Sequence, residues 1–197
     1  MSIVLLGSTS GSITLQEPAV AGTNTLSLPA VTGTFVIAGQ NSAVTAGTAV
    51  TASTTAVQFA LIPSWVQRIT MMIAGVSTNG TTAMRVQLGT GVTPTYSATY
   101  VSIVGAIAGG TAASSSFTDG FAIQRTAVAA ALYSGTIVCT RLSTNVWTYT
   151  SNIGTATSTI PSYGGGSVDL GAVATAIRLY MDGTDTFDAG SINILYE

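Results

Sequence analysis

Apolar and polar residues alternate along most of the chain from Val57 onward, which is the period of β-strands. In the stretch WVQRITMMI, one face carries Trp65, Ile69, Met71 and Ile73, and Arg68 lies on the other. Alternation, β-branched residues and aromatics together predict strands. The segments concerned are 57–65, 65–73, 84–88, 99–104, 121–125, 132–142, 146–150, 176–181 and 191–197.

One of these segments places charged and amide side chains opposite an apolar row. Met84, Val86 and Leu88 alternate with Arg85 and Gln87. The pattern predicts a strand with an apolar and a polar face.

Turn residues separate the predicted strands. STNGTT at 77–82 offers Asn79-Gly80 as a hairpin turn, and LSTNVW at 142–147 and MDGTDTF at 181–187 offer two more. No long window has a helical period with caps, and TAVAAALYSG at 126–135 has room for one helical turn at most. The fold class predicted is all-β, with a C-terminal antiparallel β-sandwich or jelly roll over 57–197.

The first forty residues have a different texture, because short extended pieces are divided by Gly, Pro and Asn. The pieces are SIVLL, SITLQ, TLSLP and TFVIA, and EPAVAGTNT and LPAVTGTFV form a weak internal repeat. Such short strands cannot bury their apolar face against themselves, so we expect an extended N-terminal β segment, 1–40, shared between subunits. Its shared core would hold Ile13, Leu15, Leu26, Leu28, Phe35 and Ile37. The alternatives are a disordered tail and a hairpin packed on its own sandwich.

Between these regions, residues 41–56 have small polar side chains and no large apolar anchor. Their composition predicts a linker or a loosely packed extension. The expected organisation is therefore 1–40, an attachment and oligomerisation segment; 41–56, a linker; and 57–197, the sandwich.

Charge is scarce. Only 6% of the residues are charged, against about 25% in ordinary domains, and the formal net charge is −2. A chain with so few cations has no electrostatic footprint for nucleic acid, and its copies repel one another little. The N-terminus lacks a basic region before its short apolar run, and no apolar run approaches ~18 residues. We expect neither a secretory signal nor membrane insertion.

Catalytic chemistry finds little support, so we expect no enzymatic activity, no cofactor and no catalytic residue. The sequence has no histidine, which removes Ser-His-Asp and Cys-His arrangements, and its single cysteine, Cys139, reads as a small buried residue of a strand. Paired carboxylates for glycoside cleavage remain conceivable. The candidates are Asp119, Asp169, Asp182, Asp185 and Asp188.

Two further motifs have structural explanations. DGTDTFD at 182–188 spaces carboxylates every third residue, which admits a surface ion, but a hairpin turn explains it better and no metal site is assigned. The glycine runs GAIAGGT and YGGGS lack the ending of a phosphate-binding loop and are expected to be sandwich loops.

Five aromatic residues are candidates for ligand contact, since exposed aromatics stack on sugar rings and dominate recognition surfaces. They are Tyr96, Tyr100, Trp147, Tyr149 and Tyr163. The alternative, which we favour for most of them, is that they line the sandwich core or a subunit seam, so none is assigned as a site.

Three blocks of the sequence resemble a known class. GSITLQEPAVAGTNTLSLPAVTGT, IPSWVQRITMMIAGVSTNGTTAMRVQLGT and the terminal DGTDTFDAGSINILYE are similar to segments of tail fibre and other structural proteins of tailed bacteriophages. Fibres of this class are typically trimeric, with an N-terminal segment attached to the particle and a β-rich C-terminal domain facing outward. The short stretch between the two parts here departs from long fibres, which have an extended shaft.

The resemblance implies a bacteriophage virion structural protein assembled in the host cytoplasm. The favoured form is a short homotrimeric tail fibre or spike for host attachment, docked on other virion proteins through its N-terminal segment, with a host cell-surface glycan as a candidate ligand. The alternative is capsid decoration by a head fibre or cement protein that stabilises the head.

Overall fold

The computed structural model describes residues 3–6, 10–15, 44–96, 98–108, 111–156 and 161–197. The chain divides into two compact units, Met1–Phe35 and Val36–Glu197. In the first unit, β1 (Ile3–Leu6) and β2 (Ser12–Leu15) form an antiparallel hairpin in which Ile3 is opposite Leu15. The predicted apolar positions from Leu26 to Ile37 lie outside the described residues.

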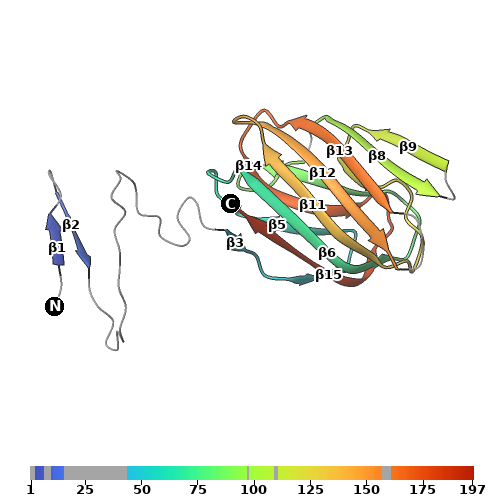
Figure 1. Ribbon diagram of the computed structural model, residues 1–197, viewed down its shortest axis with the longest axis horizontal. Helices are drawn as coiled ribbons and strands as arrows, with labels where there is room; N and C mark the ends of the chain where they lie inside the picture. Colours follow the sequence, from blue (N-terminus) through green and yellow to red (C-terminus); the bar gives the residue numbers. More distant parts are fainter. Residues whose placement is uncertain (1–2, 7–9, 16–43, 97, 109–110, 157–160) are drawn as a thin grey trace. The chain divides into compact units, whose positions relative to one another are not determined.

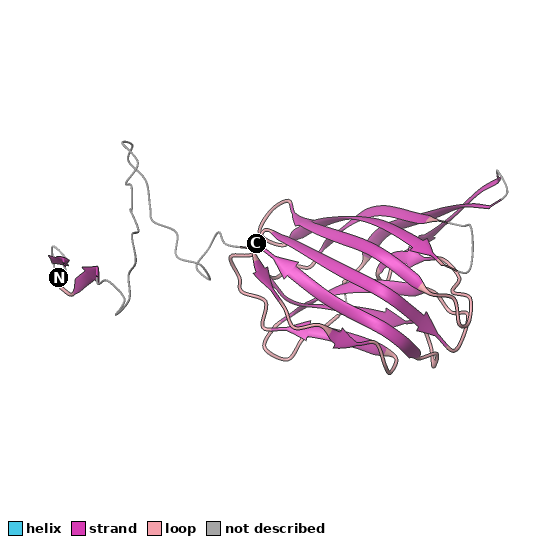
Figure 2. Ribbon diagram, turned by 60° about the horizontal axis from the view of Figure 1, so that its bottom comes forward, coloured by secondary structure: helices cyan, strands magenta, loops and turns pink. Residues whose placement is uncertain are grey.

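The second unit is an antiparallel β-sandwich, as predicted (Figures 1 and 2). The smaller sheet has the order β10-β7-β14-β5, and the larger has the order β3-β15-β6-β11-β12-β13-β8-β9, with β4 also on β15. The smaller sheet contains β5 (Ala56–Ala60), β7 (Met84–Thr90), β10 (Phe121–Gln124) and β14 (Ala174–Met181). The larger contains β3 (Thr45–Ala46), β4 (Val50–Thr51), β6 (Arg68–Thr78), β8 (Tyr100–Ala108), β9 (Thr111–Phe117), β11 (Tyr133–Arg141), β12 (Val146–Thr155), β13 (Ser162–Asp169) and β15 (Phe187–Tyr196).

The core lies between the two sheets and follows the predicted alternation. Ile69, Met71 and Ile73 of β6 are buried, and Trp65 packs half-buried at the margin of the core. Opposite them, the apolar row of β7 is fully buried. The largest buried side chains are Trp147, Tyr100, Tyr133, Phe121, Ile69, Met71, Met84, Leu88, Ile123, Ile137, Ile153 and Ile177.

No described residue is helical, so the single helical turn allowed over 126–135 is not formed. Within the same residues, no helix is long and apolar enough to cross a membrane.

The segment interpreted as a linker belongs in part to the larger sheet. Thr45–Ala46 and Val50–Thr51 pair with β15, and Ala52 is only 1% exposed. Backbone pairing requires no large side chain, so the small residues that indicated a linker also suit short edge strands. Thr45–Ala46 and Val50–Thr51 are therefore edge strands and not a free linker; residues 41–43 are outside the described part.

Two of the three predicted hairpin turns join strands that do not pair with each other. Residues 142–145 do connect the paired strands β11 and β12. Residues 79–83, however, carry the chain from β6 in the larger sheet to β7 in the smaller, and 182–186 carry it from β14 back to β15. An Asn-Gly pair predicts that the chain reverses its direction, but it does not predict which sheet the next strand joins.

These two crossings lie against each other. The Asn79 N–H donates to the Thr186 carbonyl oxygen at 3.0 Å, and the Thr186 N–H donates to Asn79 Oδ1 at 2.9 Å. The Thr82 N–H donates to Asp185 Oδ2 at 2.9 Å. The hydrogen bonds fasten one crossing to the other and fix the end of the sandwich where the chain changes sheets.

Candidate binding surfaces

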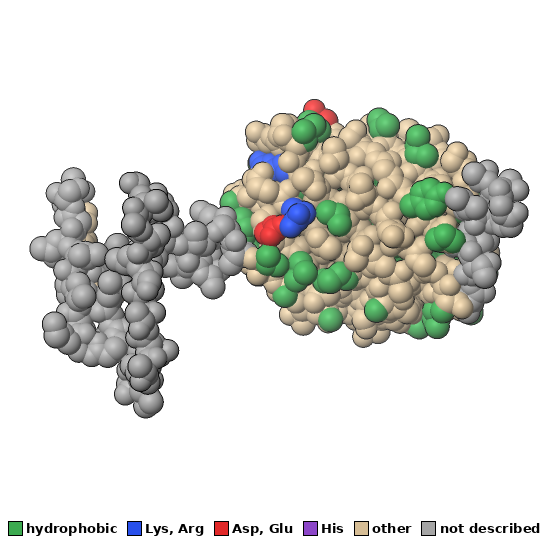
Figure 3. All heavy atoms as spheres, in the orientation of Figure 1, with side chains coloured by type: hydrophobic (Ala, Val, Ile, Leu, Met, Phe, Trp, Pro, Cys, Tyr) green, Lys and Arg blue, Asp and Glu red, His purple; other side chains and the backbone are tan. Residues whose placement is uncertain are grey.

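The outer face of the larger sheet is broad and has few charges, which are Arg68 of β6, paired with Glu197, and Asp169 at the end of β13. Along β11 and β12 the buried side chains Ile137 and Tyr149 alternate with outward-facing threonines. We call this surface the threonine face. Its outward residues are Thr70 and Met72 of β6, Thr136, Val138 and Thr140 of β11, Thr148, Thr150 and Asn152 of β12, Tyr163, Gly165 and Ser167 of β13, and Val101 and Ile103 of β8. Figure 3 looks onto this side of the molecule, where side chains that are neither apolar nor charged, together with the backbone (tan), cover most of the surface, with scattered apolar groups and few charges.

An apolar patch lies at one side of the threonine face. Val101, Ile103 and Tyr163 are 66%, 55% and 44% exposed, although all three are in regular strands. Tyr163 is opposite Gly105 in the register, and a methyl group placed on Gly105 would lie 3.2 Å from the tyrosine ring. The ring therefore rests over a position without a side chain. We call Val101, Ile103 and Tyr163 the Tyr163 patch.

The patch has the composition of a recognition surface for a neutral ligand. An aromatic ring beside aliphatic groups can stack on a sugar ring or be buried by another protein. Neighbouring serine and threonine hydroxyls donate and accept hydrogen bonds without adding charge. Val101 and Ile103 were not singled out in the sequence, although TYVSIV is apolar on both of its faces and that pattern indicates them.

The other candidate aromatics are placed differently. Tyr100, Trp147 and Tyr149 are 0%, 1% and 2% exposed, so these three belong to the core. Tyr149 stacks on Phe121 with ring centroids 4.2 Å apart, and burial raises the pKa of its phenol to about 12. Among the five, only Tyr163 presents its ring to solvent on a sheet face.

A second cluster lies on the outer face of the smaller sheet. Arg178 lies over the Tyr96 ring, 4.0 Å from its centroid, and over the Tyr180 ring at 4.9 Å. Its Nε donates to Gln87 Oε1 at 2.9 Å. Burial raises the pKa of Tyr96 to about 12, against an opposing effect of Arg178. Tyr96 is thus half-buried beneath the Arg178 guanidinium, which is already hydrogen-bonded to Gln87.

Arg85 is the centre of the same cluster. Its side chain is 7% exposed and forms ion pairs with Asp119 and Asp182, whose side chains are 57% and 55% exposed. Burial lowers the pKa of Arg85, but the Tyr180 hydrogen bond and the two carboxylates outweigh it, so the net shift is upward. The charges satisfy one another, which indicates a structural role for this cluster.

The carboxylates considered for catalysis or ion binding each have a local partner. Asp182 pairs with Arg85, Asp185 accepts from the Thr82 N–H, and Asp188 accepts from the Ser77 hydroxyl. The Thr82 hydrogen bond lowers the pKa of Asp185. Asp169 Oδ1 accepts from the Gly171 N–H at 2.9 Å, which shapes a turn. Among the described residues, no three His, Cys, Asp or Glu side chains gather as a metal site would require.

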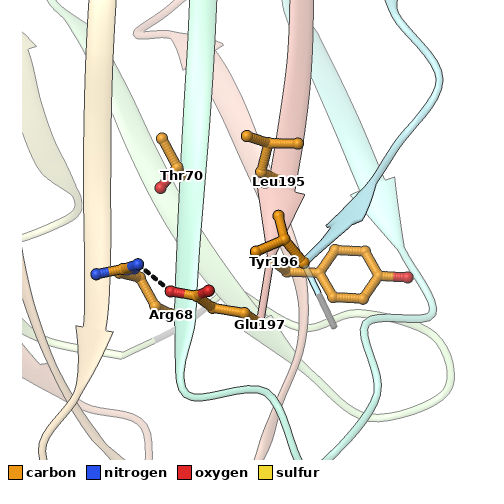
Figure 4. Close-up of a pocket in the computed structure, with 6 residues that line it drawn as sticks. Arg68, Thr70, Leu195, Tyr196 and Glu197 are labelled. Carbon is orange, nitrogen blue, oxygen red and sulfur yellow. Dashed lines mark ion pairs between the residues drawn. The ribbon is translucent and has the colours of Figure 1, made fainter. Parts of the chain in front are cut away.

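A small pocket lies beside the end of β15 (Figure 4). It has a volume of about 160 Å³ and is lined by Val44, Arg68, Thr70, Leu195, Tyr196 and Glu197. Two of these lining residues, Arg68 and Glu197, form an ion pair, drawn as a dashed line in Figure 4. Pockets for drug-sized ligands measure about 300–1,000 Å³, so this one suits an ion or a few water molecules.

Cys139 lies in β11 and is fully buried. Burial raises the pKa of its thiol to about 12, so the thiol is protonated at neutral pH. Because the thiolate is the reactive form, the expectation of an inert core cysteine is consistent with its position.

No protein-family model matches this chain, and comparisons with curated proteins and with solved structures also give no match.

Proposed function

We propose that this chain is a structural protein of a tailed-bacteriophage particle, a short homotrimeric tail fibre or spike without enzymatic activity. Its N-terminal segment would dock on other virion proteins, and its sandwich would face the host surface. The sequence resemblance of the three blocks is the origin of this proposal. The observation that supports it best is the threonine face with its exposed Tyr163 patch.

The physical argument concerns the kind of partner this face suits. A nearly uncharged surface gives no long-range attraction to nucleic acid or to charged polymers. Neutral glycan chains offer apolar ring faces and hydroxyl groups, which match an aromatic ring flanked by Ser and Thr. Binding of this type would also depend little on salt concentration.

The test is binding of the fluorescently labelled full chain to susceptible bacteria, with and without competing phage. Tyr163→Ala and Ile103→Ser should each lower binding by about tenfold, the effect of losing a hot-spot side chain. Leu142→Ser is the matched control, because Leu142 is 72% exposed in the β11–β12 turn, outside the patch. Equal binding by all variants, or no competition with phage, would contradict the attachment role.

Capsid decoration is the second candidate, and a different feature favours it. Leu61, Val92 and Leu142 are 83%, 94% and 72% exposed. They follow the ends of β5, β7 and β11, which the strand register brings to one end of the sandwich. Apolar loop tips gathered at one end suit contact with a protein lattice. Gold-labelled antibody on intact particles distinguishes the two candidates: label on the head favours decoration, and label on the tail favours the fibre.

A further inference from the structure

Two end strands of the sandwich, β10 and β9, differ in how the backbone groups on their free edge are bonded. β10 ends the smaller sheet, yet its backbone is bonded to side chains from the larger sheet. The Ala122 N–H donates to Ser102 Oγ at 2.9 Å, and the Ala122 carbonyl oxygen accepts from Tyr149 Oη at 2.8 Å. Ser162 Oγ donates to the Ile123 carbonyl oxygen. These hydroxyls close the edge that β10 would otherwise expose.

β9 lies at the end of the larger sheet (Figure 1), and among the described residues no hydrogen bond from another element closes its free edge in this way. Within the described part of the chain it pairs with one strand only, β8, in an unbroken register from Ser102–Phe117 to Ala108–Thr111. Its seven residues, TAASSSF, include no charge and no proline. Native edge strands are usually protected by charges, proline or bulges, and β9 has none of these devices.

We propose that the free edge of β9 pairs antiparallel with β9 of a second copy of this chain, about a two-fold axis at Ser114. In this register Ser114 is opposite itself, Ala113 is opposite Ser115, and Thr111 is opposite Phe117. The two larger sheets become one continuous sheet across the pair.

A second copy is the occupant that the strand itself favours. The edge is uncharged and the whole chain has a net charge of only −2, so two copies meet with little repulsion. Ser114 and Ser116 are exposed, and both are small enough to stand opposite a partner strand without steric conflict. An isologous contact is also the commonest way in which identical chains associate.

The pairing has a consequence for the Tyr163 patch. A two-fold axis perpendicular to the sheet places both patches on the same side of the continuous sheet. Two sites on one rigid support bind a repeated ligand more tightly than one site does. The pairing does not depend on the virion assignment or on the proposed trimer, because it involves β9 and not the N-terminal segment.

Disulfide formation by Ser114→Cys in the full chain is the direct test. Residues directly opposite in antiparallel strands have Cα atoms about 4.5–5.5 Å apart, within the range of a disulfide. The native Cys139 is buried and does not compete. Mild oxidation should give covalent dimers of this variant and none of Thr136→Cys, the control on the middle of the threonine face. Absence of dimers from Ser114→Cys, or equal dimers from both variants, would overturn the proposal.

A second measurement uses charge to block the edge. Ser114→Lys with Ser116→Lys places two exposed cations on β9 without altering its inward residues. The mass from sedimentation equilibrium should fall to half that of the parent, because the two partners of each β9 pair separate. Thr136→Lys with Thr140→Lys, two exposed positions on β11, should leave the mass unchanged. An unchanged mass for the β9 double variant would contradict the pairing, while leaving the cell-binding test of the function unaffected.

Discussion

Arg85 Nη2 lies 2.9 Å from Asp182 Oδ2, so a buried cation of β7 holds the start of the connection between β14 and β15. Its Nη1 pairs with Asp119, in the connection between β9 and β10. A single guanidinium thus joins two connections that are distant in sequence. The planar fork of arginine suits this role, since it donates in several fixed directions.

Replacing Arg85 should destabilise the sandwich. Arg85→Ala removes both ion pairs and the packing of the buried stem, and we expect a loss of about 2–3 kcal/mol, less than for a fully buried pair because both carboxylates are half-exposed. Chemical denaturation measures the change. Arg125→Ala, at an exposed position outside this cluster, is the control and should change stability little. Equal stability of Arg85→Ala and the parent would show that the ion pairs are not structural.

The glycine run of β13 provides a comparison between adjacent positions. A methyl group on Gly166 would overlap the Val101 carbonyl oxygen, whereas one on Gly165 meets only the Tyr149 carbonyl oxygen at 3.8 Å. Gly166→Ala should therefore cost about 1–3 kcal/mol and Gly165→Ala much less, because overpacking forces the backbone to move. Thermal denaturation of the two variants tests this. A Gly165→Ala variant as unstable as Gly166→Ala would refute the steric explanation.

The Tyr149 hydroxyl connects the two sheets, since it lies 3.0 Å from Ser102 Oγ and donates to the Ala122 carbonyl oxygen. Tyr149→Phe removes this donor from the buried Ala122 carbonyl oxygen and leaves Ser102 Oγ with the Ala122 N–H, which should cost about 1–3 kcal/mol. Hydrogen exchange of the Ala122 amide should become faster. Tyr163→Phe, on the exposed patch, should leave both measurements unchanged. Unaltered exchange in Tyr149→Phe would mean that β10 is closed by other contacts.

Alkali should unfold the sandwich through its buried tyrosines. Burial raises the pKa of Tyr96 and of Tyr149 from 10.0 to about 12, so the folded state favours the neutral phenol. This stabilisation is complete below about pH 10 and is lost as the pH rises toward about 12. Denaturation midpoints across this window should fall, and less steeply in Tyr149→Phe. A flat profile would contradict the burial of these phenols.

The sequence predicted the strands well because local alternation reports which face of a strand is apolar. In β6, Ile69, Met71 and Ile73 are buried as that pattern predicts. Local alternation does not indicate which sheet a strand joins, so the sequence predicts hairpin turns at Asn79 and Asp182 where the chain instead crosses between the sheets.

The polar positions of β7 were predicted to share a face, and they do, but Arg85 and Gln87 are both 5% exposed. Their burial depends on Tyr96, Asp119 and Tyr180, which lie outside β7, and the alternation within one strand cannot indicate such contacts. YGGGS was expected to be a loop and is instead part of β13. Its glycines allow the backbone of β13 to approach its neighbours closely. A glycine run in a sequence can indicate either such a close approach or a turn, and the sequence alone does not distinguish the two.

The sequence indicates only in part which aromatic side chains are exposed. The sequence named Tyr163 among five candidates, and burial separates it from Tyr100, Trp147 and Tyr149. The patch around it depends on Gly105 being opposite Tyr163, a register between β8 and β13 that sequence alternation does not specify.

The positions of β14 and β15 bear on how the chain is made. β14 lies between β5 and β7, and β15 lies between β6 and the short strands β3 and β4. During synthesis these earlier strands emerge from the ribosome long before the neighbours that will separate or cover them. Neither sheet can close until β14 and β15 have been translated, so the earlier strands keep unpaired edges and exposed apolar faces for most of the time in which this region is made.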